Sequence, residues 1–541
     1  MSYQLRVAFA ASFVMSACGG GGASAPASAS GQATSSQATA TLVAPADGRA
    51  EWNRATSLQV SLRDGTGTLI PHPSCSTADA STIALSGDCS TMTGYRLGTF
   101  NITVSGGGVS RDVAIKVIPQ RATIATNQTG STGSGGFNAV IAPSGQLFTW
   151  GANSFGVLGQ GLNEDALAYK ALPVPVKNPT GTGELNGIVA ASAGNRSVLA
   201  LTEDGEVYVW GQGATVAFTQ QDQISLPAKM PNAANNGSLN HIVAVSAGDS
   251  NCVALADDGT IYAWGNYAAQ GSSGADHVVY PLKVKTPDGS GVLHEVVAIA
   301  AGWNYSLALM QDGRIVAWGF NSSGVTGASS TIPVQPLPRF ITRALDGSPL
   351  SGMVSLSAGY NFAMALAADG KVYAWGANPF GQIGQGVQQG TYRQAVIVKD
   401  SAGSGELSNI ASISAGGNHA LALDADGNAF TWGYSQNGQL GDGANHPRVN
   451  QGLLPAPVVS ENGTGQLSNM VGLASGFGHS LALTSDGNVL VWGSGLRGNL
   501  GQGESTFADS FIPIAVKGPD GSGELSLAPL AVSRTSYRRY R

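Results

Sequence analysis

The sequence ISAGGNHALALDADGNAFTWG, residues 413–433, recurs with small changes along most of a 541-residue chain. A close copy, IAAGWNYSLALMQDGRIVAWG at residues 299–319, keeps the frame while GNH becomes WNY. The most regular element is the dipeptide Trp-Gly, which returns at intervals of 54 to 60 residues. Its tryptophans are Trp150, Trp210, Trp264, Trp318, Trp375, Trp432 and Trp492. Seven units of this length predict a repeat architecture.

Each unit is predicted to contain four short β-strands. In the sixth unit the runs IASISAG, ALALDADG, NAFTWG and LPAPVV follow one another, and none has the length or periodicity of an amphipathic helix. A dipeptide ending in glycine lies between the second and third runs of every unit. Asp-Gly between alternating runs predicts a hairpin with a type I′ turn, so these aspartates are turn residues rather than catalytic carboxylates. The dipeptides begin at Ser144, Asp204, Asp258, Asp312, Asp369, Asp426 and Asp486.

Four-stranded units repeated seven times predict an all-β fold, a seven-bladed β-propeller over residues 137–541. The first unit begins at FNAVIAPSG, which matches a second strand and leaves the first strand missing. We expect LAPLAVS, residues 527–533, to supply that strand and close the ring, because it follows the same GSGEL sequence that precedes the sixth unit. The tryptophan of each Trp-Gly is expected to pack between neighbouring units.

The motif SGFGHSLALTSDGNVLVWGSGLRGNLGQG, residues 475–503, resembles the repeat of the regulator-of-chromosome-condensation family. The resemblance extends over residues 137–541 and implies a seven-bladed propeller. It would also imply guanine-nucleotide exchange on a small GTPase. That reaction uses an insertion between blades, and no unit here is long enough to hold one. Exchange activity is therefore the least favoured of our functional hypotheses, because function depends on sites rather than on folds.

The first 40 residues contain no predicted part of the fold. Residues 1–18 place the apolar run VAFAASFVM, too short to span a bilayer, before MSAC. This resembles a bacterial lipoprotein signal peptide, which implies lipid attachment to Cys18 and, with Gly19 next, an outer-membrane or cell-surface location. Ordinary secretion is the alternative. Residues 19–40 are Gly, Ala and Ser with few other types, and we expect a disordered tether.

Residues 41–119 contain short alternating runs that predict a small β-sandwich in front of the propeller. The run GYRLGTFNITVSGGGVSRDVAIKVIP resembles bacterial immunoglobulin-like domains, which serve as spacers or adhesive modules. Residues 120–136 are expected to be a linker or a bridging strand. Cys75 and Cys89 are 14 residues apart and predict a disulfide in an oxidising compartment. Cys252 falls at a small, apolar position of the repeat and is expected to be an inert core thiol.

Composition and motifs give no indication of catalysis. Charged residues make up 11% of the chain and the net charge is −6, so no basic face for nucleic acid is predicted. No Gly-x-Ser-x-Gly, phosphate-loop or His-Glu-x-x-His motif is present. His419 and His479 share one position of the repeat, where we expect a structural role. We therefore predict no cofactor, no metal and no enzymatic activity, and we expect a monomer.

The variable residues of the repeat are predicted to lie on one face of the ring. In an antiparallel unit, the loop between the first two strands and the loop between the last two strands emerge on the same side. We call this side the loop face, and the side with the Asp-Gly turns the turn face. The first loop contributes Asn195, Asp249, Trp303, Tyr305, Tyr360, Phe362, Gly417 and Phe477. The second contributes Phe155, Tyr267, Phe320, Phe380, Tyr434 and Arg497.

Aromatic residues and arginine are the usual anchors of binding hot spots, so we expect the loop face to bind a protein, peptide or glycan partner. Trp303, Tyr360 and Phe477 are expected at its centre, with a gap at Gly417 and a polar rim from Asn195 and Asp249. An inhibitor of a secreted enzyme is the second hypothesis, by analogy with another bacterial propeller of this kind. Packing of these rings inward, between units, is the structural alternative.

Overall fold

The computed structural model describes residues 38–44, 49–78, 80–86, 88–119, 123–127, 136–163, 167–219, 221–266, 278–388, 390–443, 452–504 and 507–527. The predicted signal peptide, with Cys18, and most of the predicted tether lie outside these residues. The fold of the described residues is all β apart from short 3-10 turns at η1 (Ser154–Gly156), η2 (Gly213–Thr219) and η3 (Leu496–Gly498). None of the described helical segments has the length and apolar character needed to cross a membrane.

The N-terminal part forms three small sheets, with strand orders β1-β4-β5, β2-β10-β9-β6 and β3-β8-β7. Alternation along the long hairpin β9–β10 buries Ile102, Val104, Ile115 and Val117 against Leu62. Cys75 and Cys89 form the predicted disulfide. The strands are β1 (Thr39–Ala44), β2 (Arg49–Glu51), β3 (Ala55–Ser57), β4 (Gln59–Arg63), β5 (Leu69–Ile70), β6 (Ser74–Thr77), β7 (Ile83–Leu85), β8 (Thr91–Gly94), β9 (Gly98–Gly106) and β10 (Val109–Ile118).

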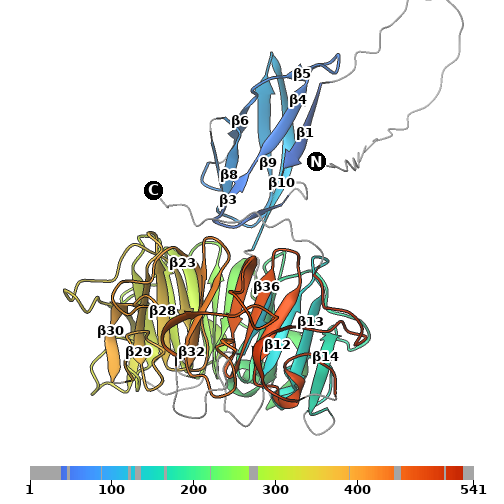
Figure 1. Ribbon diagram of the computed structural model, residues 1–541. Helices are drawn as coiled ribbons and strands as arrows, with labels where there is room; N and C mark the ends of the chain where they lie inside the picture. The colour runs from blue at the N-terminus through green and yellow to red at the C-terminus, as the bar shows by residue number, and fades with distance from the viewer. Residues whose placement is uncertain are drawn as a thin grey trace, which may run out of the picture.

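The remaining described residues form seven four-stranded antiparallel sheets, β11–β14 to β35–β38, each with its strands in chain order. Figure 1 shows these sheets side by side beneath the N-terminal domain. The first strands of successive sheets contact one another, so they form the innermost layer. They are β11 (Ile124–Thr126), β15 (Ile188–Ala193), β19 (Ile242–Ala247), β23 (Val296–Ala301), β27 (Met353–Ala358), β31 (Ile410–Ala415) and β35 (Met470–Ser475).

The second strands carry the LAL pattern and are almost completely buried between sheets. They are β12 (Phe137–Ile141), β16 (Ser197–Thr202), β20 (Asn251–Ala256), β24 (Tyr305–Met310), β28 (Phe362–Ala367), β32 (His419–Asp424) and β36 (His479–Thr484). The third strands end in Trp-Gly or just after it. They are β13 (Leu147–Ala152), β17 (Val207–Gln212), β21 (Ile261–Gly265), β25 (Ile315–Phe320), β29 (Val372–Ala377), β33 (Ala429–Gly433) and β37 (Val489–Gly493).

The fourth strands form the outer edge, where proline is tolerated because the edge lacks a further hydrogen-bonding neighbour. They are β14 (Tyr169–Pro175), β18 (Gln223–Lys229), β22 (Val278–Lys283), β26 (Val334–Phe340), β30 (Thr391–Ile397), β34 (Gly452–Pro457) and β38 (Ser510–Ala515). The inner strands are rich in alanine and serine instead, because a narrow axis leaves little room for side chains. Serine hydroxyls there accept bonds from the neighbouring inner strand, such as Ala247 N–H to Ser192 Oγ at 2.9 Å.

The Trp-Gly tryptophans connect neighbouring sheets, as the sequence predicted. All seven rings are fully buried. For six of them, the indole N–H donates to a backbone carbonyl in the third-to-fourth-strand loop of the preceding sheet. The acceptors of Trp150, Trp210, Trp264, Trp375, Trp432 and Trp492 are the carbonyls of Asn499, Val157, Thr215, Val325, Gln382 and Gln439, at 2.7 to 3.3 Å.

The ring closes differently from our prediction. The innermost strand of the first sheet is β11, which pairs with β12 from Ile124↔Val140 to Thr126↔Asn138. It lies inside the segment 120–136 that we expected to be a linker or a bridging strand, and the second alternative agrees with this pairing. The prediction that residues 527–533 supply this strand is wrong. The sequence alone could not identify β11 as a strand, because three residues are too few to show an alternation of apolar and polar side chains. Leu527 is buried and its N–H bonds Gly487 O, while residues 528–533 lie outside the described residues.

The Asp-Gly hairpins are present, but their turn type differs from the prediction. In the second sheet, Gly205 N–H donates to Thr202 O and Thr202 N–H donates to Glu206 O, each at 3.0 Å. The loop therefore has three residues, and only its glycine has a positive φ, +79°. This is a type I turn followed by a left-handed glycine rather than type I′. The aspartate remains a turn residue in both cases.

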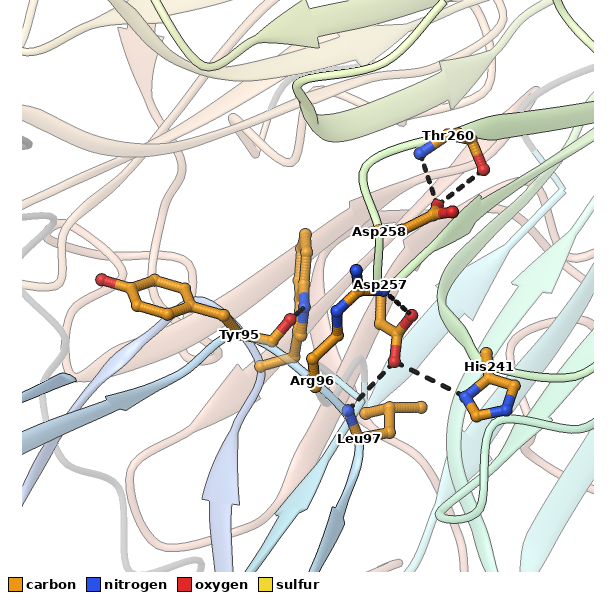
Figure 2. A network of polar contacts seen from close by, with 8 residues as sticks. Tyr95, Arg96, Leu97, His241, Asp257, Asp258 and Thr260 are labelled. Atoms are coloured by element: carbon orange, nitrogen blue, oxygen red, sulfur yellow. Dashed lines mark hydrogen bonds and ion pairs between the residues drawn. The ribbon is translucent and has the colours of Figure 1, made fainter. Parts of the chain in front are cut away.

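The N-terminal domain rests on the turn face, as Figures 1 and 2 show. Asp257, beside the Asp-Gly turn of the third sheet, accepts from Arg96 at 3.0 Å and from the Leu97 N–H at 3.1 Å. Lys116 reaches the second sheet's turn at Asp204, 2.9 Å away. One buried apolar cluster also extends from the N-terminal domain into the third sheet. The loop face points away from this contact.

Replacing Trp150 or Trp210 by phenylalanine tests ring closure. Trp210 connects consecutive sheets, and Trp210→Phe leaves the buried Val157 carbonyl without this donor, which should cost about 1–3 kcal/mol of unfolding free energy. Trp150 bonds across the closing seam to Asn499, whose carbonyl keeps Asn138 Nδ2 as a second donor, so Trp150→Phe should cost about 1 kcal/mol. In a closed ring, urea unfolding should show a loss for both variants, the smaller one for Trp150→Phe. A loss for Trp210→Phe with none for Trp150→Phe would mean that the first and last sheets are not joined.

Candidate functional site

The loop face is organised by the glycine of the SAG motif, which follows the inner strand of every sheet except the first, where Asn127 follows β11. A Cβ placed on Gly194 would lie 2.1 Å from Gly248 O, and one on Gly248 would lie 2.2 Å from Gly302 O. The same approach continues from Gly302 to Gly359, Gly416 and Gly476, at 2.4 to 2.6 Å. Only glycine fits where backbones meet this closely. The constant glycines therefore form an inner ring, and the variable residue after each one lies at its mouth.

Three of these variable residues form a continuous aromatic cluster with one ring from the second loop. Trp303 stacks on Tyr360 with ring centres 4.9 Å apart and an interplanar angle of 25°. Phe477 meets Tyr360 edge to face at 5.7 Å, and Phe320 meets Trp303 in the same way at 5.4 Å. We call these four rings the aromatic arc. All four are partly exposed. The rings pack against one another on the loop face rather than between sheets.

The predicted gap at Gly417 does not exist. A Cβ at Gly417 would lie 2.7 Å from Phe477 Cδ2, so the Phe477 ring occupies the space over this glycine. Sequence spacing could not show this, because it gives the order of the residues but not the direction of a neighbouring side chain. The glycine instead lets Phe477 lean across the sixth sheet toward Tyr360, and this makes the arc continuous.

The polar pair Asn195 and Asp249 lies beside the arc but is not the open rim that we predicted. Asp249 is only 8% exposed. Its carboxylate accepts from Asn195 Nδ2 at 2.6 Å and from Ser250 Oγ at 2.9 Å, and Arg196 Nε is 3.9 Å away. Burial, and to a smaller extent the Asp249 charge, raises the pKa of Tyr360. The pair therefore braces the loops under the arc.

The second loops contribute two further contacts on this face. Phe380 and Tyr434 meet at 4.8 Å with an interplanar angle of 61° and join the fifth and sixth sheets. The guanidinium of Arg196 lies 5.2 Å from the centre of the Phe155 ring. Arg497 has a positive φ of 54° at the closing seam. Tyr267, also predicted for this face, lies outside the described residues.

Tyr305 and Phe362 are buried, so their prediction as binding-face residues is wrong. Their exposed fractions are 1% and 0%. The Tyr305 hydroxyl donates toward Gly359 O and Phe362 O of the next sheet, and burial raises its pKa. They begin the second strand, at the repeat position of His419 and His479. Tyr305 and Phe362 belong to the same strands as the buried LAL residues that follow them. Including them in those strands would have predicted that their rings are buried between sheets.

The two histidines also connect neighbouring sheets. His419 Nε2 lies 2.9 Å from Ser480 Oγ in the seventh sheet. His479 Nε2 lies 2.6 Å from Asn138 Oδ1 and 2.7 Å from Thr126 Oγ1, across the closing seam. Because an amide oxygen only accepts, His479 carries its proton on Nε2. Burial lowers the pKa of both histidines to about 3, so both are neutral at pH 7.

A pocket of about 420 Å³ opens on the loop face at this seam. Tyr434, Gln436 and Asn437 of the sixth sheet's loop form one wall. The rest of the lining comes from the seventh sheet and the start of β12, namely Gly136, Phe477, Gly478, His479, Ser494, Leu496 and Asn499. The sequence prediction had found Tyr434 and Phe477 but missed the amides, because loop amides in one sequence carry no pattern that distinguishes ligand contacts from turns.

Within the described residues, no three His, Cys, Asp or Glu side chains converge as metal ligands. Cys252 is fully buried and burial raises its pKa to about 12, which agrees with an inert core thiol.

Comparison with known proteins agrees with this architecture. Family models match an RCC1-like domain at residues 274–529 and regulator of chromosome condensation (RCC1) repeats at 144–201 and 242–266. The protein pim1 of Schizosaccharomyces pombe is 28% identical over 69% of this chain and 70% of its own. The ultraviolet-B receptor UVR8 of Arabidopsis thaliana is 27% identical over 72% of this chain and 82% of its own.

Among solved structures, yeast RCC1 (Prp20) bound to Kap60 superposes with a TM-score of 0.56. It is 24% identical and covers 70% of this chain and 86% of its own, which supports the fold alone. These matches, together with the seven four-stranded sheets, support an RCC1-like repeat propeller.

The neutral buried histidines predict a loss of stability in mild acid. Their pKa is depressed in the folded state, so below the unfolded value of about 6.5 the unfolded chain binds protons that the folded chain does not. Unfolding free energy should fall from pH 7 to pH 5 by up to about 1.4 kcal/mol per pH unit for each histidine. His419→Asn, which copies Asn251 at the same repeat position, should reduce this slope in urea titrations. An identical slope in the variant would contradict it.

Proposed function

We propose that this protein is a non-enzymatic binding module that presents the loop face of a closed seven-bladed propeller to a partner. The observation that carries the proposal is the aromatic arc, Trp303, Tyr360, Phe477 and Phe320, at the mouth of the ring. Partly exposed aromatic rings in contact with one another are typical of binding hot spots. The N-terminal domain occupies the opposite face, which leaves the arc accessible.

The proposed architecture extends to the N-terminal part of the chain. We infer that the three small sheets are an immunoglobulin-like β-sandwich serving as a spacer, with residues 1–18 a lipoprotein signal peptide and Cys18 the lipidated first residue. The disulfide between Cys75 and Cys89 favours an oxidising, extracytoplasmic compartment. A membrane anchor before the N-terminal domain would direct the loop face away from the bilayer, toward a partner.

Inhibition of a secreted enzyme is a second form of the same activity, since an inhibitor also binds through one face. Guanine-nucleotide exchange has no support from a particular residue of this chain. The loop-face pocket is lined by amides, aromatic rings and a neutral histidine, without a pair of carboxylates for hydrolytic chemistry. This composition favours recognition over catalysis.

Truncation of two rings of the arc tests the binding face. Trp303→Ala and Tyr360→Ala should keep the wild-type melting temperature within a few degrees, since these rings lie outside the buried core. Each should weaken partner binding by roughly thirtyfold, the usual effect of losing an aromatic anchor. The partner is captured by cross-linking on intact source cells, purified and titrated against each variant. Tyr95→Ala, an exposed ring of the N-terminal domain, is the matched control.

Normal binding by both arc variants would refute this site, and so would a melting temperature lowered as for a core deletion of about 3–5 kcal/mol.

Metabolic labelling with a palmitate analogue tests the anchor. Wild-type protein should be labelled and Cys18→Ser should not, because the thiol of Cys18 is the proposed attachment site. Equal labelling of the two proteins, or a mature chain beginning elsewhere, would exclude lipidation at this residue.

A further inference from the structure

The pocket at the closing seam lies next to the aromatic arc and shares Phe477 with it. Its volume, about 420 Å³, falls within the range of roughly 300–1,000 Å³ that small-ligand sites usually have. Tyr434 and Phe477 supply aromatic surface, and Gln436 and Asn437 supply amides on the same wall. The pocket therefore combines apolar faces with groups that both donate and accept hydrogen bonds.

The described lining of the pocket carries no charge at neutral pH. It contains no aspartate, glutamate, lysine or arginine, and its one titratable ring besides tyrosine, His479, is held neutral by burial. An anionic or cationic ligand would therefore lose its hydration without gaining a counter-charge, which is costly. A neutral ligand has no such penalty.

One buried polar group beside the pocket lacks a hydrogen-bond partner within the described residues. Asn499 is 1% exposed and lines the pocket, and its Oδ1 accepts no hydrogen bond within the described residues. A buried acceptor without a donor is uncommon in folded proteins. The backbone of this residue is fixed, because its carbonyl accepts from Trp150 Nε1 and from Asn138 Nδ2. A ligand with a hydroxyl or N–H donor would satisfy this oxygen once the Asn499 side chain turns toward the pocket.

Asp509 does not line the pocket, but its carboxylate hydrogen-bonds to both of the loops that form the pocket walls. Its carboxylate accepts from Asn437 Nδ2 at 3.3 Å and from the Gly495 N–H at 2.9 Å. This contact fixes the Asn437 amide against the loop that carries Ser494 and Leu496. The polar wall is thus held in place before a ligand arrives, which reduces the ordering cost of binding.

We propose that this pocket binds a neutral saccharide, with one sugar ring packed against Tyr434 or Phe477. A pyranose has apolar C–H faces that fit aromatic rings and hydroxyls that both donate and accept, which matches Gln436, Asn437 and the free acceptor of Asn499. This inference rests on the proposed function, because it names a glycan as the class of partner that the loop face recognises. An uncharged peptide shares some of this chemistry, but its extended backbone suits a groove or sheet edge better than a bounded pocket.

Saturation-transfer NMR on the full chain tests the proposal, with the methyl glycosides of glucose, galactose, mannose and N-acetylglucosamine as probes. At least one should receive saturation from the protein. Tyr434→Ala and Asn437→Ala should each weaken its binding by about tenfold or more. Tyr434→Phe keeps the ring and should retain affinity within about threefold. Tyr95→Ala, which removes an exposed ring of the N-terminal domain far from the loop face, should leave the dissociation constant unchanged. Circular dichroism and melting curves verify that each variant is folded.

Several results would overturn the inference. These are the absence of saturation transfer to all four glycosides, unchanged binding in both folded pocket variants, or loss of binding in Tyr95→Ala. Binding of acetyl-glycine-glycine amide that is lost in the pocket variants, with no glycoside bound, would reassign the pocket to peptides. The arc experiment remains separate: a captured partner that requires Trp303, without glycoside binding, would leave the proposed function standing and remove only this inference.

Discussion

The fold depends on one repeated interaction, the hydrogen bond from a buried indole N–H to a loop carbonyl of the preceding sheet. This bond joins neighbouring sheets at six described positions. One of the six, Trp150–Asn499, joins the last sheet to the first. The indole can come this close to the loop because the loop has a glycine there, such as Gly501 in the sequence LGQG at residues 500–503. A Cβ at Gly501 would lie 3.2 Å from Trp150 Nε1 and 2.7 Å from a Val516 methyl group. A lost indole donor would remove a hydrogen bond between buried groups of two sheets, so tryptophan and glycine are constrained together.

The same interface explains why the ring has a constant frame and variable loops. The first position of the second strand reaches the next sheet in different ways, through Tyr305 to Gly359 O, through Asn251 to Tyr305 O and through His479 to Thr126. Each solution satisfies a buried polar group across the interface. The side chain of the residue that follows the SAG glycine does not have one common partner in the next sheet. Its contacts differ from sheet to sheet, so its identity is free to change. That freedom produces the aromatic arc on one side of the mouth and the Asn195–Asp249 brace on the other.

The closing seam differs from the other interfaces because two distant parts of the chain form it. Thr126, Asn138, His479 and Asn499 meet there, and the first two follow directly from the N-terminal domain. The domain is therefore tied to the ring twice, through β11 in the inner layer and through Asp257 and Arg96 on the turn face. The pocket opens beside the same seam, where the third-to-fourth-strand loops of the sixth and seventh sheets meet Gly136 and His479.

The sequence by itself determined the repeat, its strands, the packing of the Trp-Gly rings between sheets, the disulfide and the inert character of Cys252, because each depends on spacing or on residue type. Only the tertiary structure decided that β11 closes the ring, since three residues are too short to show a period. It also decided which aromatic residues are accessible: Tyr305 and Phe362 turn inward while Trp303 and Tyr360 meet on the surface. Phe477 covers Gly417 and Asn138 meets His479 through contacts between separate sheets, and local sequence contains no information about which distant loop will be the neighbour.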